Sequence, residues 1–370
     1  MSYTNNILKY FPNLNGLRFI AAFMVVISHI ELFKSYYLLP NIYNNLRFQF
    51  IGKLGVQLFF VLSGFLITYL LLNEKENKEN INIKNFYVRR ILKIWPLYFL
   101  IAILGLFVLP QIHLFDVPGL SEHVKEKFGT KILFTFLFLP NVIDMIYPFL
   151  PFTFQLWSIA VEEQFYLFAP WIMKKSKNTF AAFIWVIISV IAIKYAIKFI
   201  YFYYPHYLIK HIYNILYYFS IDSMAIGALG AHLYYFKFPI LQTIYNKYFQ
   251  ILNILVFILY YYFQAPKWPY FQDEFYAFVF GIIVINAATN KNSIIKLENK
   301  LFNYLGTISY STYMVHLIAL AFSFGILNKL DMLNNVRAYA LSIAVTYLLS
   351  IIVNKYFESW FLAFKSKFNS

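Results

Sequence analysis

The feature that most constrains this chain is a succession of apolar segments, each close to the length that crosses the hydrocarbon core of a membrane. A membrane-spanning helix needs about 20 mostly apolar residues. The ten candidate segments cover residues 15–36, 54–73, 94–109, 154–173, 180–202, 212–235, 249–263, 271–288, 305–324 and 338–356. The sequence therefore predicts an all-α integral membrane protein, built as a bundle of about ten transmembrane helices.

The composition excludes several other classes of protein. Hydrophobic residues make up 61% of the 370 residues and charged residues only 13%, which leaves too little polar surface to cover a soluble globule. The net charge of +15 therefore points to the bilayer, where Lys and Arg hold loops on the cytoplasmic side, and not to nucleic acid. The chain has no cysteine and no HExxH pattern, so we expect no metal site.

The number of spans depends on an eleventh apolar segment, residues 131–147. Pro140, Asn141 and Asp144 interrupt it, which predicts a re-entrant or interfacial segment. A ten-span topology puts most Lys and Arg in the cytoplasm, whereas eleven spans would put most of them outside. The first apolar segment has no small-residue cleavage site, so it is predicted to remain as a helix. We therefore expect both termini to lie in the cytoplasm.

Two ionisable residues lie in the first apolar segment, Arg18 near its start and His29 near its end. An unpaired ionisable group inside a membrane is costly, so its presence indicates a function. The two residues are about three helical turns apart, which puts them on one helix face with His29 roughly 16 Å deeper. One face of this helix is thus predicted to carry a cation at the entrance and an acid or base further in.

Later apolar segments carry further ionisable residues, Glu162, Glu163, Asp222 and His316. Groups at similar depth are costly unless they face one another or water, so we expect a central polar cavity. The adjacent glutamates project about 100° apart, and only one of them can face that cavity fully. Asp222 and His316 are possible cavity-lining residues, although each could instead form a structural hydrogen bond between helices.

The spacing of Arg18 and His29 resembles the signature of the membrane-bound acyltransferase type 3 family, which is an arginine, ten residues and a histidine. Further strings similar to those of the family follow in the expected order over nearly the whole chain. They are FFVLSGFLITYLLL from Phe59, FYVRRILKIWPLY from Phe86, LWSIAVEEQFYL from Leu156, DSMAIGALGA from Asp222 and ISYSTYMVHL from Ile308.

The resemblance implies an integral membrane O-acyltransferase. Such an enzyme moves an acyl group, expected to be acetyl, from cytoplasmic acyl-CoA to a hydroxyl of a carbohydrate or lipid-linked glycan. Acyl-CoA, expected to be acetyl-CoA, would be a co-substrate, and no bound cofactor is expected. Residues 1–370 would form a single acyltransferase transmembrane domain in a bacterial inner membrane, without the extracytoplasmic domain of some family members. The oligomeric state stays open.

The resemblance also suggests roles for the acid and base groups. His29 would take the proton of the acceptor hydroxyl, or would carry the acyl group briefly as a nucleophile, because imidazole exchanges protons near neutral pH. The alternative is a histidine that only forms a hydrogen bond within the bundle. The pattern of the family favours Glu162 over Glu163 as the carboxylate that orients a histidine.

Four basic residues are predicted to bind the phosphates of acyl-CoA: Arg18, Arg89, Arg90 and Lys93. They lie at the cytoplasmic ends of their predicted helices, and guanidinium groups bind phosphate through two parallel hydrogen bonds. The family usually has a second arginine where Lys93 stands, and a lysine cannot form that paired contact. Basic residues at this depth could also anchor the chain to anionic lipid and set its topology.

The alternative function is a proton-coupled secondary transporter or flippase for a glycan or an anionic substrate. Its intramembrane histidines and carboxylates would relay protons. Transporters of this kind commonly contain paired repeats with broken helices at matching places. The only interrupted segment, residues 131–147, has no counterpart elsewhere in the sequence, which favours the acyltransferase.

Overall fold

The computed structural model describes residues 10–121, 126–147, 152–263, 272–365 and 368. These residues form helices joined by short connections, and no strand occurs among them. In this described part, six helical stretches are long and apolar enough to cross a membrane. They are α1 (Leu14–Tyr36), α2 (Leu46–Lys78), the stretch that begins with α3 (Ile83–Gln111), α7 (Thr179–Tyr203), α14 (Ser309–Lys329) and the stretch that begins with α15 (Asn335–Phe364). The predicted all-α, multi-pass membrane architecture is therefore confirmed.

The predicted count of ten spans is not confirmed. Four helices occupy the other predicted segments: α6 (Leu156–Lys175), α9 (Ile221–Tyr235), α11 (Lys247–Phe263) and α12 (Gln272–Thr289). These four helices do not reach the length and mean hydropathy of the six stretches above, because they are shorter or carry more polar residues. The first residue predicted for the eighth segment, Phe271, lies outside the described residues.

Several helices end or change pitch where the sequence suggested one continuous span. Residues 212–235 are divided between α8 (Tyr207–Tyr218) and α9, and residues 305–324 between α13 (Lys300–Thr307) and α14. These breaks begin α9 and α14 inside the protein, so polar residues at the first turn of α14 reach a cavity. The long stretches continue as η1 (Leu104–Val108) and η2 (Leu109–Gln111) after α3 (Ile83–Ile103), and as η5 (Val353–Glu358) and α16 (Ser359–Lys365) after α15 (Asn335–Ile352).

The interrupted segment at residues 131–147 forms two short helices, α4 (Phe128–Phe136) and α5 (Pro140–Ile143). Pro140 occupies the first turn of α5, where its missing N–H group costs no helical hydrogen bond. A helix of nine residues is about 14 Å long, so neither helix can cross a membrane. The interruption predicted from Pro140 is therefore present. The remaining short elements are η3 (His113–Phe115) and α10 (Ile240–Tyr245).

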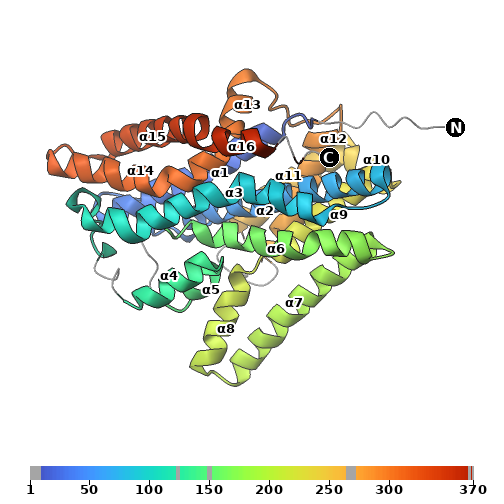
Figure 1. Ribbon diagram of the computed structural model, residues 1–370, viewed down its shortest axis with the longest axis horizontal. Helices are drawn as coiled ribbons and strands as arrows, with labels where there is room; N and C mark the ends of the chain where they lie inside the picture. Colours follow the sequence, from blue (N-terminus) through green and yellow to red (C-terminus); the bar gives the residue numbers. More distant parts are fainter. Residues whose placement is uncertain (1–9, 122–125, 148–151, 264–271, 366–367, 369–370) are drawn as a thin grey trace.

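Helices α1, α2, α9, α12 and α14 form the centre of the bundle, while α7 and α8 diverge from it (Figure 1). The apolar part of α2 is 78% buried and that of α7 only 11%, so α7 presents most of its surface to lipid. Helices α2 and α9 approach closely because glycine lies at their contact. A Cβ atom at Gly64 would lie 1.9 Å from the Met224 carbonyl oxygen, and one at Gly227 would lie 2.1 Å from the Val61 carbonyl oxygen.

Replacing Gly227 with alanine is expected to destabilise the protein by about 1–3 kcal/mol, because the added methyl group meets backbone that cannot move aside locally. Thermal unfolding in detergent, followed by size-exclusion chromatography, measures the change. Gly129→Ala is the matched control, since a Cβ atom there has open space around it. Equal unfolding temperatures for the two variants would contradict the close packing of α2 on α9.

Candidate active site

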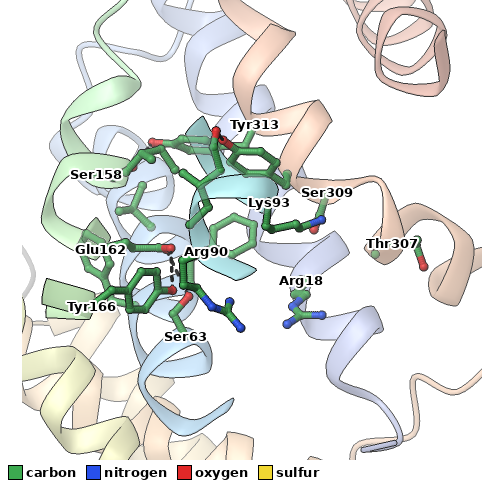
Figure 2. Close-up of a pocket in the computed structure, with 17 residues that line it drawn as sticks. Arg18, Ser63, Arg90, Lys93, Ser158, Glu162, Tyr166, Thr307, Ser309 and Tyr313 are labelled. Atoms are coloured by element: carbon green, nitrogen blue, oxygen red, sulfur yellow. Dashed lines mark hydrogen bonds between the residues drawn. The ribbon is translucent and has the colours of Figure 1, made fainter. Parts of the chain in front are cut away.

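A cavity of about 160 Å³ lies between α1, α2, α3, α6 and the α13–α14 junction (Figure 2). Three cationic side chains line it, Arg18 from α1 and Arg90 and Lys93 from α3, and we call it the basic cavity. Arg90 and Lys93 are three residues apart, which brings them to one face of α3. Arg18 lies near the start of α1, so the three cations come together from two helices.

Two of these cations have no carboxylate partner within the described residues. Arg18 donates only to the Asn15 side-chain oxygen, at 3.3 Å. The Arg90 Nε atom is buried without a hydrogen-bond partner, and its guanidinium carbon lies 5.7 Å from the centre of the Tyr166 ring. Lys93 differs, because its Nζ atom lies 3.5 Å from a Glu358 carboxylate oxygen. Arg18 and Arg90 are half-buried. Cations at such sites without a carboxylate partner are costly, which makes this cavity suited to an anionic ligand.

Glu162 is the one carboxylate among the described residues that line the basic cavity. It accepts hydrogen bonds from Ser63 Oγ at 3.2 Å and from the Tyr166 hydroxyl at 3.0 Å. The neighbouring Glu163 points elsewhere and accepts from Trp95 Nε1 at 2.9 Å, while its other oxygen is buried without a partner. The adjacent glutamates thus diverge, as their position on one helix requires. With three cations around one carboxylate, the cavity keeps an excess of positive charge.

A second cavity, of about 400 Å³, contains His29, and we call it the histidine cavity. Two residues, Val56 and Tyr313, line both cavities. Aromatic and amide side chains dominate the rest of its wall; they include Tyr43, Gln49, Gln155, Trp157, Tyr217, Tyr218 and Gln272. Aromatic faces beside amide groups suit a ligand that carries both apolar ring faces and hydroxyl groups.

Among the described residues, the groups that were expected around one central cavity are distributed over two adjoining cavities, or lie at neither of them. Arg18 and His29 occupy one helix but line different cavities, and Val56 of α2 and Tyr313 of α14 line both of these cavities. Glu162 lies with Arg18 in the basic cavity and not with His29. Helix geometry sets the side of α1 from which both residues project, whereas the residues that fill the space between them come from other helices.

The neighbour of His29 is His316, whereas a glutamate, Glu162, was expected to orient the histidine. The two ring nitrogens, His29 Nδ1 and His316 Nε2, are 3.1 Å apart. His316 Nδ1 lies 2.6 Å from the Tyr313 carbonyl oxygen, and a carbonyl oxygen can only accept, so this nitrogen carries the hydrogen. In the neutral rings, His316 Nε2 then accepts from His29 Nδ1–H, and the lone pair of His29 lies on Nε2. This chain of hydrogen bonds fixes the His29 ring and leaves its Nε2 lone pair free to accept a proton.

The structure places His316 and Asp222, the possible cavity-lining residues, at neither of these two cavities, and the alternative of hydrogen bonds between helices describes their contacts. Both side chains are fully buried and border neither cavity, since each is held by neighbouring helices. Asp222 accepts from Lys194 Nζ at 2.7 Å, and the same ammonium lies 3.1 Å from Glu274. Asp222 thus belongs to an ionic contact that joins α7, α9 and α12. Lys194 and Lys198 are the two charged residues of the apolar segment 180–202, and they were the signal that the sequence analysis missed.

Arg89 also lies away from the basic cavity. Its guanidinium forms an ion pair with Glu74 at 2.9 Å and donates to the Phe368 carbonyl oxygen at 3.0 Å. The structure therefore brings together three of the four basic residues predicted to bind phosphate. No group of three or more histidine, aspartate or glutamate residues in the described ranges could hold a metal ion.

The sequence analysis missed several residues that complete the two cavities. Tyr166 lies four residues after Glu162, so helical spacing from a predicted site residue could have found it. Tyr310 and Tyr313 line the basic cavity as well, and Tyr310 lies six residues before His316, where no such spacing marks it. Ser158 lies four residues before Glu162 and shares its helix face. No comparable signal marks Val56, because an apolar residue in an apolar segment has nothing that distinguishes it.

Comparison with known proteins gives one family and several relatives. The family described as an acyltransferase domain matches residues 11–355. A candidate O-acetyltransferase of Staphylococcus aureus is 27% identical over 345 residues, which cover 85% of this chain and 51% of that protein. A peptidoglycan O-acetyltransferase of Listeria monocytogenes is 32% identical over 167 residues, which cover 44% of this chain and 24% of that protein. The chain spans about half the length of the first of these relatives, and no solved structure matches it.

Proposed function

This chain belongs to the acyltransferase family whose domain it matches over residues 11–355, and we propose that it is an integral membrane O-acyltransferase of glycans. The acyl group, proposed to be acetyl, would come from cytoplasmic acyl-CoA and pass to a hydroxyl of a carbohydrate or lipid-linked glycan. The observation that carries this proposal is the pair of cavities that meet at Tyr313, one with unpaired arginines and one with an oriented histidine.

The donor would bind from the side of the basic cavity. Arg18 and Arg90 would hold phosphate oxygens, because guanidinium groups without partners gain most from a bidentate anion. Lys93 would add charge without the paired geometry, since Glu358 already holds its ammonium. Glu162 is held by hydrogen bonds from Ser63 and Tyr166. Its negative charge would reduce the repulsion between the arginines and keep them close together.

The acceptor would bind in the histidine cavity, where His29 Nε2 takes the hydroxyl proton. The hydroxyl oxygen attacks the thioester carbonyl, a new C–O bond forms, and the C–S bond breaks. His29 then returns its proton to the thiolate of CoA. While His29 is charged, the hydrogen bond from its Nδ1–H to His316 Nε2 stabilises the imidazolium. In the nucleophilic alternative, His29 Nε2 attacks the thioester carbonyl and the C–S bond breaks to release the thiolate of CoA. The acceptor hydroxyl then attacks the acyl-histidine, whose C–N bond breaks, and the hydroxyl proton passes to the thiolate.

The orientation in the membrane is part of the proposal. Ten spans result if α6, α9 with α8, α11 and α12 also cross, and both termini then lie in the cytoplasm of a bacterial inner membrane. Arg18, near the start of α1, then lies at the cytoplasmic side, where acyl-CoA is found. The transporter alternative is not favoured, because family membership supports group transfer and gives no support to transport.

Purified protein is expected to release CoA thiol from acetyl-CoA only when a glycan acceptor is present, with one acetyl ester formed for each thiol. Fragments of peptidoglycan glycan strands are the first acceptor to test, because one relative is named for that substrate. Thiol release and ester formation are measured in the same sample. A transporter would release no thiol, so folded protein that is inactive with every glycan fraction and acyl-CoA tried would contradict the proposal.

A further inference from the structure

The two cavities share part of their lining, and we call this shared part the wall. Val56 of α2 and Tyr313 of α14 are the only described residues that line both cavities, and each is about 95% buried, with 6% and 5% of its surface exposed. Figure 2 shows Tyr313 and Ser158 at one end of the basic cavity and Arg18 and Arg90 at the other. The wall therefore lies at the end of the basic cavity that is far from its arginines.

The tyrosine side of this wall is fixed by hydrogen bonds. The Tyr313 hydroxyl lies 2.7 Å from Ser158 Oγ and 3.2 Å from the Gln155 carbonyl oxygen, both on or beside α6. Its ring centre lies 5.9 Å from that of Phe59 and 5.7 Å from that of His316. A ring held at its hydroxyl and packed on both sides cannot swing aside cheaply.

The valine side of the wall is rigid for another reason. A β-branched side chain in a helix has one strongly preferred χ1 rotamer, so Val56 has little freedom to move its methyl groups. Its neighbours Gly52 and Gly55 pack directly against α1, at Ser28 and at Ala21 and Val25, which holds this part of α2 close to the helix that carries His29. The wall is thus built from one clamped ring and one rigid aliphatic side chain.

We infer that Val56 and Tyr313 set the length of the acyl group that this protein transfers. The inference builds on the proposed function, in which an acyl group bound from the basic cavity must come within reach of His29 in the histidine cavity. The carbonyl carbon of the acyl group would meet the acceptor hydroxyl at this wall. The rest of the acyl chain must then fit beside Val56 and Tyr313. A rigid wall accepts a methyl group and excludes longer chains.

The wild-type protein is expected to prefer acetyl-CoA to propionyl-CoA, since one methylene group at a tight apolar site changes kcat/KM by about 10–200-fold. Val56→Ala removes two methyl groups from the wall and is expected to raise the ratio of propionyl to acetyl transfer by about 10-fold or more. Val56→Ile adds a methylene and is expected to lower the ratio further. Thiol release with acetyl-CoA, propionyl-CoA and butyryl-CoA as donors measures these ratios.

The matched control is Val284→Ala, which removes the same atoms from a fully buried position on α12 that borders neither cavity. Its propionyl to acetyl ratio should equal that of the wild type. An unchanged ratio in Val56→Ala and in Val56→Ile, in protein that still transfers acetyl, would overturn the inference while leaving the proposed function intact. A wild-type protein that transfers no acyl group at all would instead contradict the proposed function.

Discussion

Replacing His29 with alanine is expected to lower kcat/KM for acyl transfer by about 10²–10⁴-fold, the range that a general base contributes. Alanine removes the only imidazole in the histidine cavity, since His316 lies behind His29 and borders no cavity among the described residues. The acceptor hydroxyl then has to lose its proton to water. Thiol release and glycan ester formation, measured at matched protein concentration, test the expectation.

The control for this variant is His113→Ala, which removes a fully exposed histidine from η3. Its activity should match that of the wild type. Full activity of His29→Ala in well-folded protein would remove His29 from the chemistry and would leave it as a structural histidine bonded to His316. Mixing the wild type with labelled acetyl-CoA but no acceptor separates the two active roles, because only a nucleophile would retain the label on the protein.

The order of the helices and the divergence of Glu162 and Glu163 could be predicted because each depends on one segment alone. An apolar run of 20 residues specifies a helix, and adjacent positions on a helix differ by 100° whatever surrounds them. The ten-span count could not be derived with the same certainty. Helix α6 carries Glu162 and Glu163 and ends with two lysines, and these polar residues lower its hydropathy below that of an ordinary membrane span.

The partners of the site residues could not be predicted, because they come from other helices. His316 is 287 positions from His29, and Lys194 is 28 positions from Asp222. The sequence analysis placed each of these residues in a membrane segment but had no means of pairing them. The separation of Arg18 from His29 has the same origin, since it depends on Val56 and Tyr313, which belong to α2 and α14.

Replacing Arg90 with glutamine is expected to raise the half-saturating concentration of acetyl-CoA by about 10–100-fold. A hydrogen bond to a charged group contributes about 1.5–3 kcal/mol, and 1.4 kcal/mol corresponds to a factor of ten. The contribution of Arg90 should fall in this range, because no carboxylate among the described residues forms an ion pair with its guanidinium and its Nε atom has no hydrogen-bond partner. Initial rates of thiol release over a range of acetyl-CoA concentrations give the value.

Two comparisons test whether Arg90 acts on phosphate. Arg89→Gln removes the same charge one position away, but it breaks an ion pair with Glu74 outside the cavity, so its half-saturating concentration should change less than about threefold. Acetyl-pantetheine, a thioester donor without phosphate groups, should be used equally well by the wild type and by Arg90→Gln. A defect of Arg90→Gln that persists with acetyl-pantetheine would mean that this arginine holds the bundle together and does not bind the donor. A defect that vanishes with it would assign Arg90 to the phosphates, because the only difference between the two donors is the part of the molecule that carries them.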